Sequence, residues 1–246
     1  MSKLSTLVLM FCCAISLAVT AQNSDSLKQI SVESNEVKGY NSYNSIKPPF
    51  YKQIIIPSLL TTYGFLALKN KKLKEWDSHV KDEIWNRHPH QPNHFDDWLQ
   101  YMPSFSVYVL NSLGVKGKNN LLDATRMYLI SSLTMMVVVQ SIKKITSLPR
   151  PDGFGANTFP SGHTSTAFVA AEFLNQEYKD RSPLIGIVGY LAASTVGYMR
   201  LYNNRHWFSD IISGAGIGIG ITKLVYWVYP KIKKKFWPEK KQIPFY

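Results

Sequence analysis

Six mostly apolar runs, separated by short polar segments, constrain the fold of this chain more than any other feature. They span 53–68, 98–115, 127–142, 161–178, 184–199 and 207–229. The strong periodic signals along the chain are helical, and no convincing strand pattern appears. We therefore expect an all-α protein.

The runs are close to the length that a bilayer requires, which is about 20 mostly apolar residues. Several lie at or below the lower limit, and the mean hydropathy of −0.12 is low for a multi-pass protein, so a soluble helical bundle competes. The alternate glycines of 214–220 favour a membrane, because they form overlapping pairs of small residues four apart. Tyr226, Trp227 and Tyr229 add an interfacial aromatic belt before the lysine-rich end. We interpret the helices as transmembrane.

The formal net charge of +12 and the isoelectric point near 9.5 indicate anionic partners. Lysines concentrate in 69–74 and 231–241. No basic helix with interleaved aromatic residues resembles a nucleic-acid reader. Acidic lipids and phosphorylated substrates therefore fit this charge better than nucleic acid does.

Composition divides the chain into four parts. Residues 1–21 combine a positive residue, an apolar run and a small-residue cleavage site, which is typical of a signal peptide, with an uncleaved anchor as the alternative. Both cysteines lie in this segment, so a processed chain would have neither a disulfide nor a catalytic thiol. We expect 22–50 to be poorly ordered, 51–230 to form the helical domain, and 231–246 to be a basic tail.

The charged segment 69–97 carries an amphipathic helical pattern and ends in three histidines. Its apolar residues recur three and four positions apart, which predicts a helix at an interface or on a protein surface. His88, His90 and His94 are close enough to suggest a metal site. Two intervening prolines prevent one helix from aiming them together, so solvated histidines are the simpler interpretation.

Three polar clusters lie at the edges of the apolar runs. They read Lys143-Lys144-Ile145-Thr146-Ser147-Leu148-Pro149-Arg150-Pro151, Pro160-Ser161-Gly162-His163, and Arg200-Leu201-Tyr202-Asn203-Asn204-Arg205-His206-Trp207-Phe208-Ser209-Asp210. If each run crosses once and the lysine-rich end is cytoplasmic, all three clusters lie on the periplasmic face. A cleaved signal would leave residue 22 outside, which does not fit this count, so we expect 53–68 not to cross.

Lys143, Arg150 and Arg200 offer three positive charges to a phosphoryl group. Phosphoryl transfer depends largely on positioning that group and neutralising its non-bridging oxygens, and arginines can bind them in a bidentate manner. Taken singly, each cation has a simpler explanation. Lys143 would be a snorkelling residue at a helix end, and Arg150 would be an ordinary loop arginine.

Ser161 and Gly162 come at the start of a helix, where an anion can bind. Their free backbone N–H groups would point at the anion with the helix dipole behind them, and glycine would let an oxyanion approach the backbone. The alternative is that Ser161 only caps the helix. Asp123 is likewise expected to cap the helix that carries 127–142.

His206 and Asp210 are four residues apart, so on a helix they would lie on one face within hydrogen-bonding reach. A carboxylate on one ring nitrogen fixes the tautomer and leaves the other nitrogen free to act as a nucleophile. A second histidine, His163, could protonate a leaving alkoxide. A single pair at this spacing is weak evidence, so the prediction depends on the combination of clusters.

In combination, Lys143-x6-Arg150, Pro-Ser-Gly-His163 and Arg200-x5-His206-x3-Asp210 resemble the signature of the phosphatidic acid phosphatase type 2 superfamily, which shares its fold with vanadium haloperoxidases. The resemblance covers roughly 143–210 and implies a six-helix bundle. It departs at residue 199, where methionine replaces the usual serine, which affects at most a supporting hydrogen bond.

By position, the resemblance implies a phosphatase that uses neither a metal nor another cofactor. His206 would attack phosphorus to form a phosphohistidine, Asp210 would orient His206, and His163 would protonate the leaving group. The phosphoryl oxygens would be held by Lys143, Arg150, Arg200, Ser161 and Gly162. The clusters contain no group of carboxylates, in agreement with a mechanism in which protein cations replace magnesium.

The resemblance also implies a substrate class and a location. It suggests a multi-pass protein of a bacterial inner membrane that acts, on the periplasmic side, on a lipid phosphate such as lipid A, undecaprenyl pyrophosphate or phosphatidylglycerophosphate. Alternatives are a soluble periplasmic acid phosphatase, a vanadate haloperoxidase and a non-enzymatic membrane scaffold. The best candidates for substrate choice are 69–97 and 152–159, outside the motifs.

Overall fold

The computed structural model describes residues 49–88 and 90–236. The expected signal segment 1–21, nearly all of the polar segment 22–50 and the end of the basic tail lie outside these residues. Within the described ranges the regular structure is helical, and β pairing is limited to an isolated bridge between Pro149 and Ala156. The expected all-α fold class is confirmed.

The helices follow the apolar runs closely. They are α2 (Phe50–Ala67), α3 (Lys71–Lys81), the π-helical turn η1 (Asp82–Asn86), α4 (Phe95–Leu99), α5 (Met102–Ser112), α6 (Leu121–Thr146), α7 (Gly162–Tyr178), α8 (Pro183–Tyr202) and α9 (Phe208–Phe236). Helix α9 continues past Pro230, so the first residues of the expected basic tail are helical.

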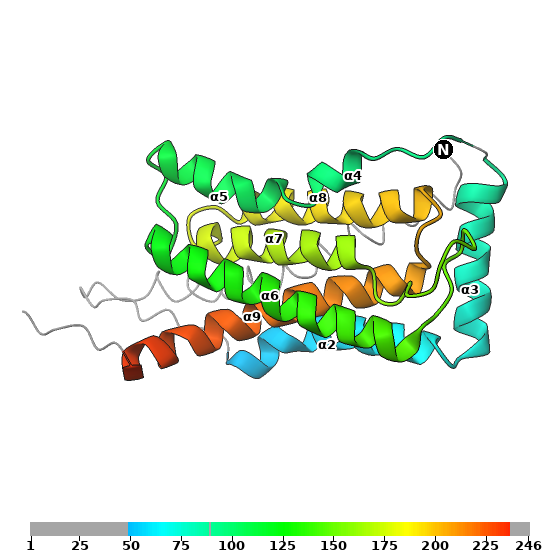
Figure 1. Ribbon diagram of the computed structural model, residues 1–246. Coiled ribbons are helices and arrows are strands. Elements are labelled where there is room, and N and C mark those ends of the chain that lie inside the picture. Colours follow the sequence, from blue (N-terminus) through cyan, green and yellow to red (C-terminus); the bar gives the residue numbers. More distant parts are fainter. Residues whose placement is uncertain (1–48, 89, 237–246) are drawn as a thin grey trace, which may run out of the picture.

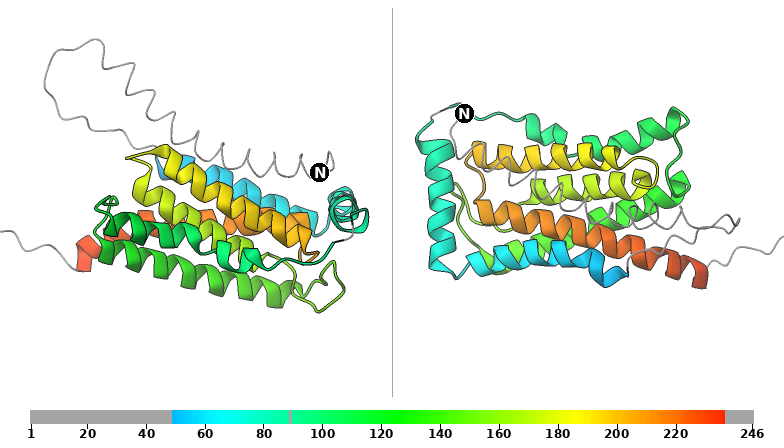
Figure 2. Two further views of the ribbon diagram at one scale, coloured as in Figure 1. Left: turned by 90° about the horizontal axis from the view of Figure 1, so that it is seen from above. Right: turned by 180° about the vertical axis from the view of Figure 1, so that it is seen from behind.

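The longer helices run side by side, and α3 crosses one end of them. Figure 1 shows α2, α5, α6, α7, α8 and α9 roughly aligned, with α3 across the end at which α6 finishes and α7 begins. Figure 2 gives the same arrangement from above and from behind. Helix α7 is central, because it packs against α5, α6, α8 and α9. The bundle is of the kind that the motifs imply.

Glycines let α9 approach two helices on opposite sides. A Cβ at Gly218 would lie 2.5 Å from the carbonyl oxygen of Ser165 on α7, and Gly214 faces α7 one turn earlier. A Cβ at Gly216 would lie 2.6 Å from the carbonyl oxygen of Pro57 on α2. The expected close packing through small residues is confirmed, and the two faces of alternate glycines serve different partner helices.

The start of α6 is capped by Asn120, which corrects the expectation that Asp123 is the cap. The Asn120 side chain accepts the backbone N–H of Asp123 at 2.9 Å. The Asp123 carboxylate instead accepts the Tyr229 hydroxyl at 2.7 Å and the Lys233 ammonium at 2.6 Å. It therefore ties the beginning of α6 to the end of α9.

Within residues 49–88 and 90–236, three helices, α6, α8 and α9, are long and apolar enough to cross a membrane. The outer face of α6 exposes large apolar side chains, including Leu129, Leu133 and Val137, and α8 exposes Leu184 and Val188. A continuous apolar exterior of this kind suits contact with lipid. These features support a multi-pass membrane protein.

Helix α2 is not one of these three, yet it packs lengthwise on α9 and runs along the bundle. Its packing in the bundle does not decide whether it crosses a membrane, so the expectation that 53–68 does not cross stays a prediction. Its buried positions are Pro57, Gly64 and Ala67.

The predicted amphipathic helix in 69–97 is α3, continued by η1. Val80 and Ile84 are buried, whereas the lysines at the start of α3 are exposed. Asn70 caps α3, because its side chain accepts the N–H groups of Lys72 and Leu73 at 3.0 and 3.3 Å. The helix lies across the bundle end that carries the three polar clusters (Figure 1).

Candidate active site

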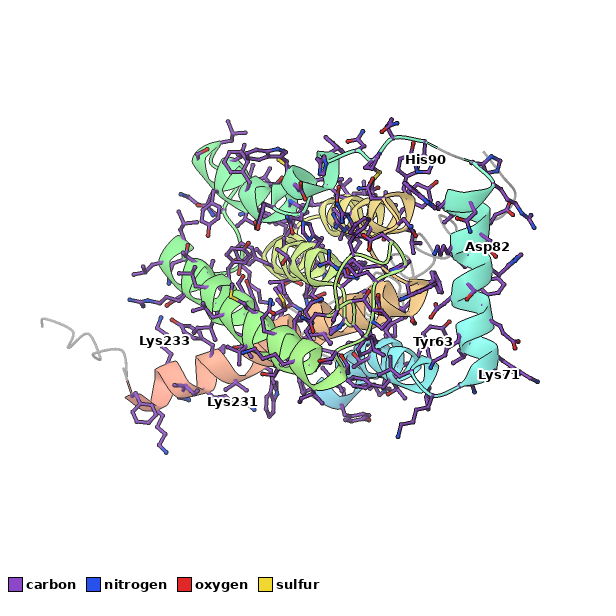
Figure 3. All side chains as sticks on the ribbon, turned by 45° about the vertical axis from the view of Figure 1, so that its right-hand side comes forward. Tyr63, Lys71, Asp82, His90, Lys231 and Lys233 are labelled. Atoms are coloured by element: carbon purple, nitrogen blue, oxygen red, sulfur yellow. The ribbon has the colours of Figure 1, made fainter. Side chains whose placement is uncertain are left out.

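The structure brings all three polar clusters to one end of the bundle. They occupy the end of α6 with the loop after it, the start of α7, and the loop between α8 and α9. Figure 3 shows Lys71 on α3 and Asp82 on η1 at this end, and Lys231 and Lys233 at the opposite end. The shared location follows from the antiparallel order of the helices, as the sequence predicts.

His206 and Asp210 form a buried pair at the start of α9. His206 lies in the loop just before the helix, and Asp210 lies in its first turn. The Nδ1 atom of His206 lies 3.3 Å from Oδ2 of Asp210. The same carboxylate oxygen accepts the backbone N–H of Trp207 at 2.9 Å and the hydroxyl of Thr158. Because Nδ1 faces the carboxylate, Nε2 is the nitrogen available to a substrate.

Burial lowers the pKa of His206 to about 4, against the opposing effect of the hydrogen bond and charge of Asp210. The positive charges of Lys143 and Arg200 add to the lowering. At neutral pH the imidazole is therefore uncharged and keeps a lone pair. This is the protonation state that a nucleophile requires.

His163, in the first turn of α7, pairs with a carboxylate from a distant part of the chain. Its Nε2 atom lies 2.8 Å from Oδ1 of Asp97 on α4. The Asp97 carboxylate also lies 3.4 Å from Nδ1 of His94. Nothing in the sequence assigns Asp97 to the site, since acidic residues in the first turn of a helix are common and stabilise its dipole.

Arg200 is held by Asp96, the residue next to Asp97. Its guanidinium donates to the fully buried carboxylate of Asp96 and lies 3.9 Å from Asp97. Asn203 also donates to Asp96, at 3.3 Å. Within the described residues the buried Nε of Arg200 has no hydrogen-bond partner, so one donor of this cation is available to an anion.

Lys143 and Arg150 lie at the loop between α6 and α7. The Lys143 ammonium donates to the carbonyl oxygens of Asn157 at 2.5 Å and Thr158 at 3.2 Å. The Nε atom of Arg150 is buried and, in the part of the chain that the structure describes, makes no hydrogen bond. Like Arg200, Arg150 retains an unused donor, whereas Lys143 is partly occupied by the loop.

Ser161 differs from the expectation that its backbone N–H is free. That N–H donates to the carbonyl oxygen of Asp210 at 3.0 Å, which links the start of α7 to the start of α9. The Ser161 side chain is buried and caps α7 by accepting the N–H of Thr164 at 3.4 Å. Ser161 is thus the helix cap, which was the alternative reading of this position.

Gly162 keeps open space beside it. A Cβ at Gly162 would meet no atom within 4 Å. The residue occupies the first position of α7, where backbone N–H groups have no partner inside the helix. Gly162 therefore fits the expected anion contact better than Ser161 does.

Helix α3 holds the loops of this site in place. Asp77 accepts the backbone N–H of Ser209 at 2.9 Å and its hydroxyl at 2.6 Å. Lys81 donates to the carbonyl oxygen of Pro151 at 2.7 Å. The sequence offered one signal for Asp77, which is a charged residue on the same face of the predicted helix as the apolar Val80.

Burial raises the pKa of Asp77 to about 6, although both hydrogen bonds from Ser209 oppose the rise. The nearby charge of Asp210 adds to it. A cavity of about 300 Å³ lies beside Asp77 and Asp210 and is walled by Leu148 and Trp207. This cavity borders the segment 69–97, which the sequence singles out for substrate choice.

The three histidines of 88–94 do not converge on a common point. Both ring nitrogens of His90 face carbonyl oxygens, of His88 at 2.5 Å and of Tyr202 at 2.6 Å. The ring of His90 stacks on Tyr202 with centroids 3.6 Å apart. His90 therefore fastens the loop to α8 and has no nitrogen left for a metal.

Among the described residues, one group has the geometry to hold a metal ion. It comprises Asp96, Asp97 and His163, whose ligand atoms lie within 4.8 Å of one another. The Arg200 guanidinium already neutralises Asp96 in this group. A cation there would have to compete with a buried ion pair, so these residues fit a metal poorly.

Known proteins resemble both the sequence and the fold. Residues 125–234 match the PAP2 superfamily. Over 136 residues the chain is 38% identical to a lipid A 1-phosphatase of Porphyromonas gingivalis, a match that covers 54% of this chain and 30% of that protein. This chain therefore spans under a third of the length of that relative.

Two solved structures match this chain at 20% sequence identity. A transmembrane PAP2-type phosphatidylglycerolphosphate phosphatase from Bacillus subtilis matches with a TM-score of 0.54, over 73% of this chain and 98% of the other. LpxE of Aquifex aeolicus matches with a TM-score of 0.41, over 69% and 93%. The three sequence motifs, between Lys143 and Asp210, lie inside the stretch 125–234 that matches the PAP2 superfamily.

Proposed function

We propose that the protein is a lipid phosphate phosphatase that works through a phosphohistidine and without a metal ion. The observation that carries the proposal is the pairing of an uncharged, buried His206 with Asp210, close to the cations Lys143 and Arg200, with Arg150 near Lys143. A neutral nucleophile next to unused guanidinium donors suits attack on an anionic phosphorus centre.

The reaction has two steps. Nε2 of His206 attacks phosphorus, the bond from phosphorus to the ester oxygen breaks, and the leaving oxygen takes a proton from His163. Water then cleaves the phosphorus–nitrogen bond, with His163 accepting its proton, and inorganic phosphate leaves. Arg150, Arg200 and the Gly162 N–H hold the phosphoryl oxygens during both steps.

A lipid substrate is supported by the exterior of the bundle and by the relatives. The apolar outer faces of α6 and α8 would keep the site end at a membrane surface. The P. gingivalis relative is named for the 1-phosphate of lipid A, which makes that lipid the first candidate. Undecaprenyl pyrophosphate and phosphatidylglycerophosphate are the next two.

The topology that accompanies this proposal has six crossing elements. They are α2, α4 with α5, and α6 to α9, with the basic end of α9 in the cytoplasm. Because α2 crosses in this count, the topology takes the uncleaved anchor as the alternative for residues 1–21. The site end and α3 then face the periplasm of a bacterial inner membrane. Release of the protein by osmotic shock without detergent would contradict the topology and favour a soluble acid phosphatase.

The test is phosphate release by the purified protein in detergent, with a chelator present, from lipid A 1-phosphate and the two other candidate lipids. We expect release without added magnesium, and none from a His206→Ala variant. Labelled phosphate retained on the denatured wild-type protein would identify the phosphohistidine. Unchanged release by the variant would refute the mechanism and favour a non-enzymatic role for these motifs.

A further inference from the structure

The three sequence motifs contain His163 but not its partner, Asp97, so the pairing of these two residues could not be read from the motifs. Asp97 comes from α4, and its Oδ1 lies 2.8 Å from Nε2 of His163. With Nε2 facing the carboxylate, the imidazole has its Nδ1 left for another partner. The side chains of His163 and Asp97 are 35% and 44% exposed, so the pair lies at the open side of the site.

Helix α4 is anchored firmly enough to position a side chain. Asp96 is fully buried and pairs with Arg200, one of the cations of the site. Asn203 donates to the carbonyl oxygen of Asn93 at 2.7 Å and accepts the N–H of the same residue at 2.9 Å. These contacts fix α4 against the end of α8, so Asp97 is held at its distance from His163.

We propose that Asp97 is a positioning residue that holds His163 as the acid for the leaving oxygen, which rests on the proposed function. The protonated ring donates its Nε2 proton to Asp97 and directs its Nδ1 proton at the bridging oxygen. When the phosphorus–oxygen bond breaks, that oxygen takes the Nδ1 proton, and the Nε2 proton stays on the ring in its hydrogen bond to the Asp97 carboxylate. His163 leaves the step neutral, ready to take a proton from water.

The charges around His163 explain why an acid here needs a carboxylate. The groups that face it are Arg200 on α8 and Asp96 and Asp97 on α4, with His94 on the far side of Asp97. Burial and the Arg200 guanidinium disfavour a protonated imidazole, whereas a carboxylate in contact favours it. Asp96 is already committed to Arg200, which leaves Asp97 for His163.

The test compares two leaving groups in the full-length protein in detergent. Decyl phosphate leaves as a strongly basic alkoxide that must be protonated, whereas p-nitrophenyl phosphate leaves as a stable anion. In Asp97→Asn we expect kcat for decyl phosphate to fall about 100-fold, and that for p-nitrophenyl phosphate to change by less than about threefold. Glu83→Gln is the matched control, because Glu83 pairs with Arg87 at 2.6 Å and is not among the residues placed at the site.

A double-mutant cycle separates positioning from general damage. Adding Asp97→Asn to His163→Ala should cause no further loss on decyl phosphate, because the acid through which Asp97 acts is gone. Asp97→Glu, which keeps a carboxylate, should recover part of the rate. Equal losses on both substrates, including those from a misfolded variant, or additive losses with His163→Ala, would overturn the inference.

The outcome for wild-type protein distinguishes this inference from the function on which it rests. No phosphate release from either ester by the wild type, or release that His206→Ala leaves intact, would defeat the proposed phosphatase itself. A wild type that depends on His206 and an Asp97→Asn variant with an unchanged rate on decyl phosphate would defeat the role of Asp97 alone.

Discussion

The two histidine–carboxylate pairs of the site are built in opposite ways. His206 and Asp210 are four residues apart and their side chains are 4% and 2% exposed. His163 and Asp97 are 66 residues apart in the chain and considerably more exposed. The buried pair keeps its imidazole uncharged, whereas the open pair places a carboxylate beside an imidazole that, in the proposed mechanism, carries a proton. This difference in surroundings is what would let similar side chains serve as nucleophile and acid.

The largest effect should come from removing the nucleophile. His206→Ala should reduce kcat about 10⁴-fold or more, and by the same factor for decyl and p-nitrophenyl phosphate, because every turnover needs the attack on phosphorus. Steady-state phosphate release measures both. His79→Ala, on the exposed side of α3, is the control. If kcat fell for decyl phosphate alone, His206 would be the acid and His163 the nucleophile.

Removal of Asp210, the carboxylate that orients His206 in the buried pair, should have the second-largest effect on kcat. Asp210→Asn should lower kcat about 10³-fold, because it removes the partner that fixes the His206 tautomer. In contrast to Asp97→Asn, the loss should not depend on the leaving group. Parallel kinetics on both esters test this, and a leaving-group dependence in Asp210→Asn would erase the distinction between the pairs.

The free energy of unfolding should fall much more when Asp96 is removed than when its neighbour Asp97 is removed. Asp96→Ala leaves the Arg200 guanidinium buried and unpaired, so it should destabilise the protein by about 3–5 kcal/mol. Asp97→Ala removes a partly exposed carboxylate and should cost about 1 kcal/mol or less. Unfolding of the detergent-solubilised variants gives the comparison. Equal destabilisation would mean that α4 is held by both residues.

The charge state of the buried histidine can be measured directly. Nitrogen NMR of the His206 ring should show a neutral imidazole from pH 5 to 8, with a titration midpoint at about 4, below its ordinary value of 6.5. Because the folded value is depressed, its contribution to stability is present above 6.5 and is lost as the pH falls through 4. A midpoint at 6.5 or higher would contradict a buried nucleophile.

The smallest effect concerns Asp77, which supports the buried pair from α3. Its pKa of about 6 lies above the ordinary 3.8. The stability it contributes is therefore present below 3.8 and is lost as the pH rises through 6, by at most about 3 kcal/mol. Unfolding of Asp77→Asn from pH 4 to 7 should lack this decline, and a decline equal to that of the wild type would assign it to another group.

The same contrast explains what the sequence could predict. His206 and Asp210, and the helix start at Ser161, are local patterns that a periodicity of 3.6 residues makes readable. Asp97 and Asp96 meet the site only because α4 packs on α8 and α7, and no spacing in the sequence encodes that contact. The N–H of Ser161 was misassigned for the same reason, since its partner is the carbonyl oxygen of distant Asp210.

The alternate glycines of α9 have a consequence for motion. The backbone of α9 touches α2 on one face and α7 on the other. A shift between these three helices would break backbone contacts, and a change of side-chain rotamer could not restore them. We therefore expect them to move as one body. Any opening that admits a substrate should then fall to α3 and the loops of the site, which are joined by side-chain hydrogen bonds from Asp77 and Lys81. Substrate entry would then be limited by how quickly those hydrogen bonds exchange.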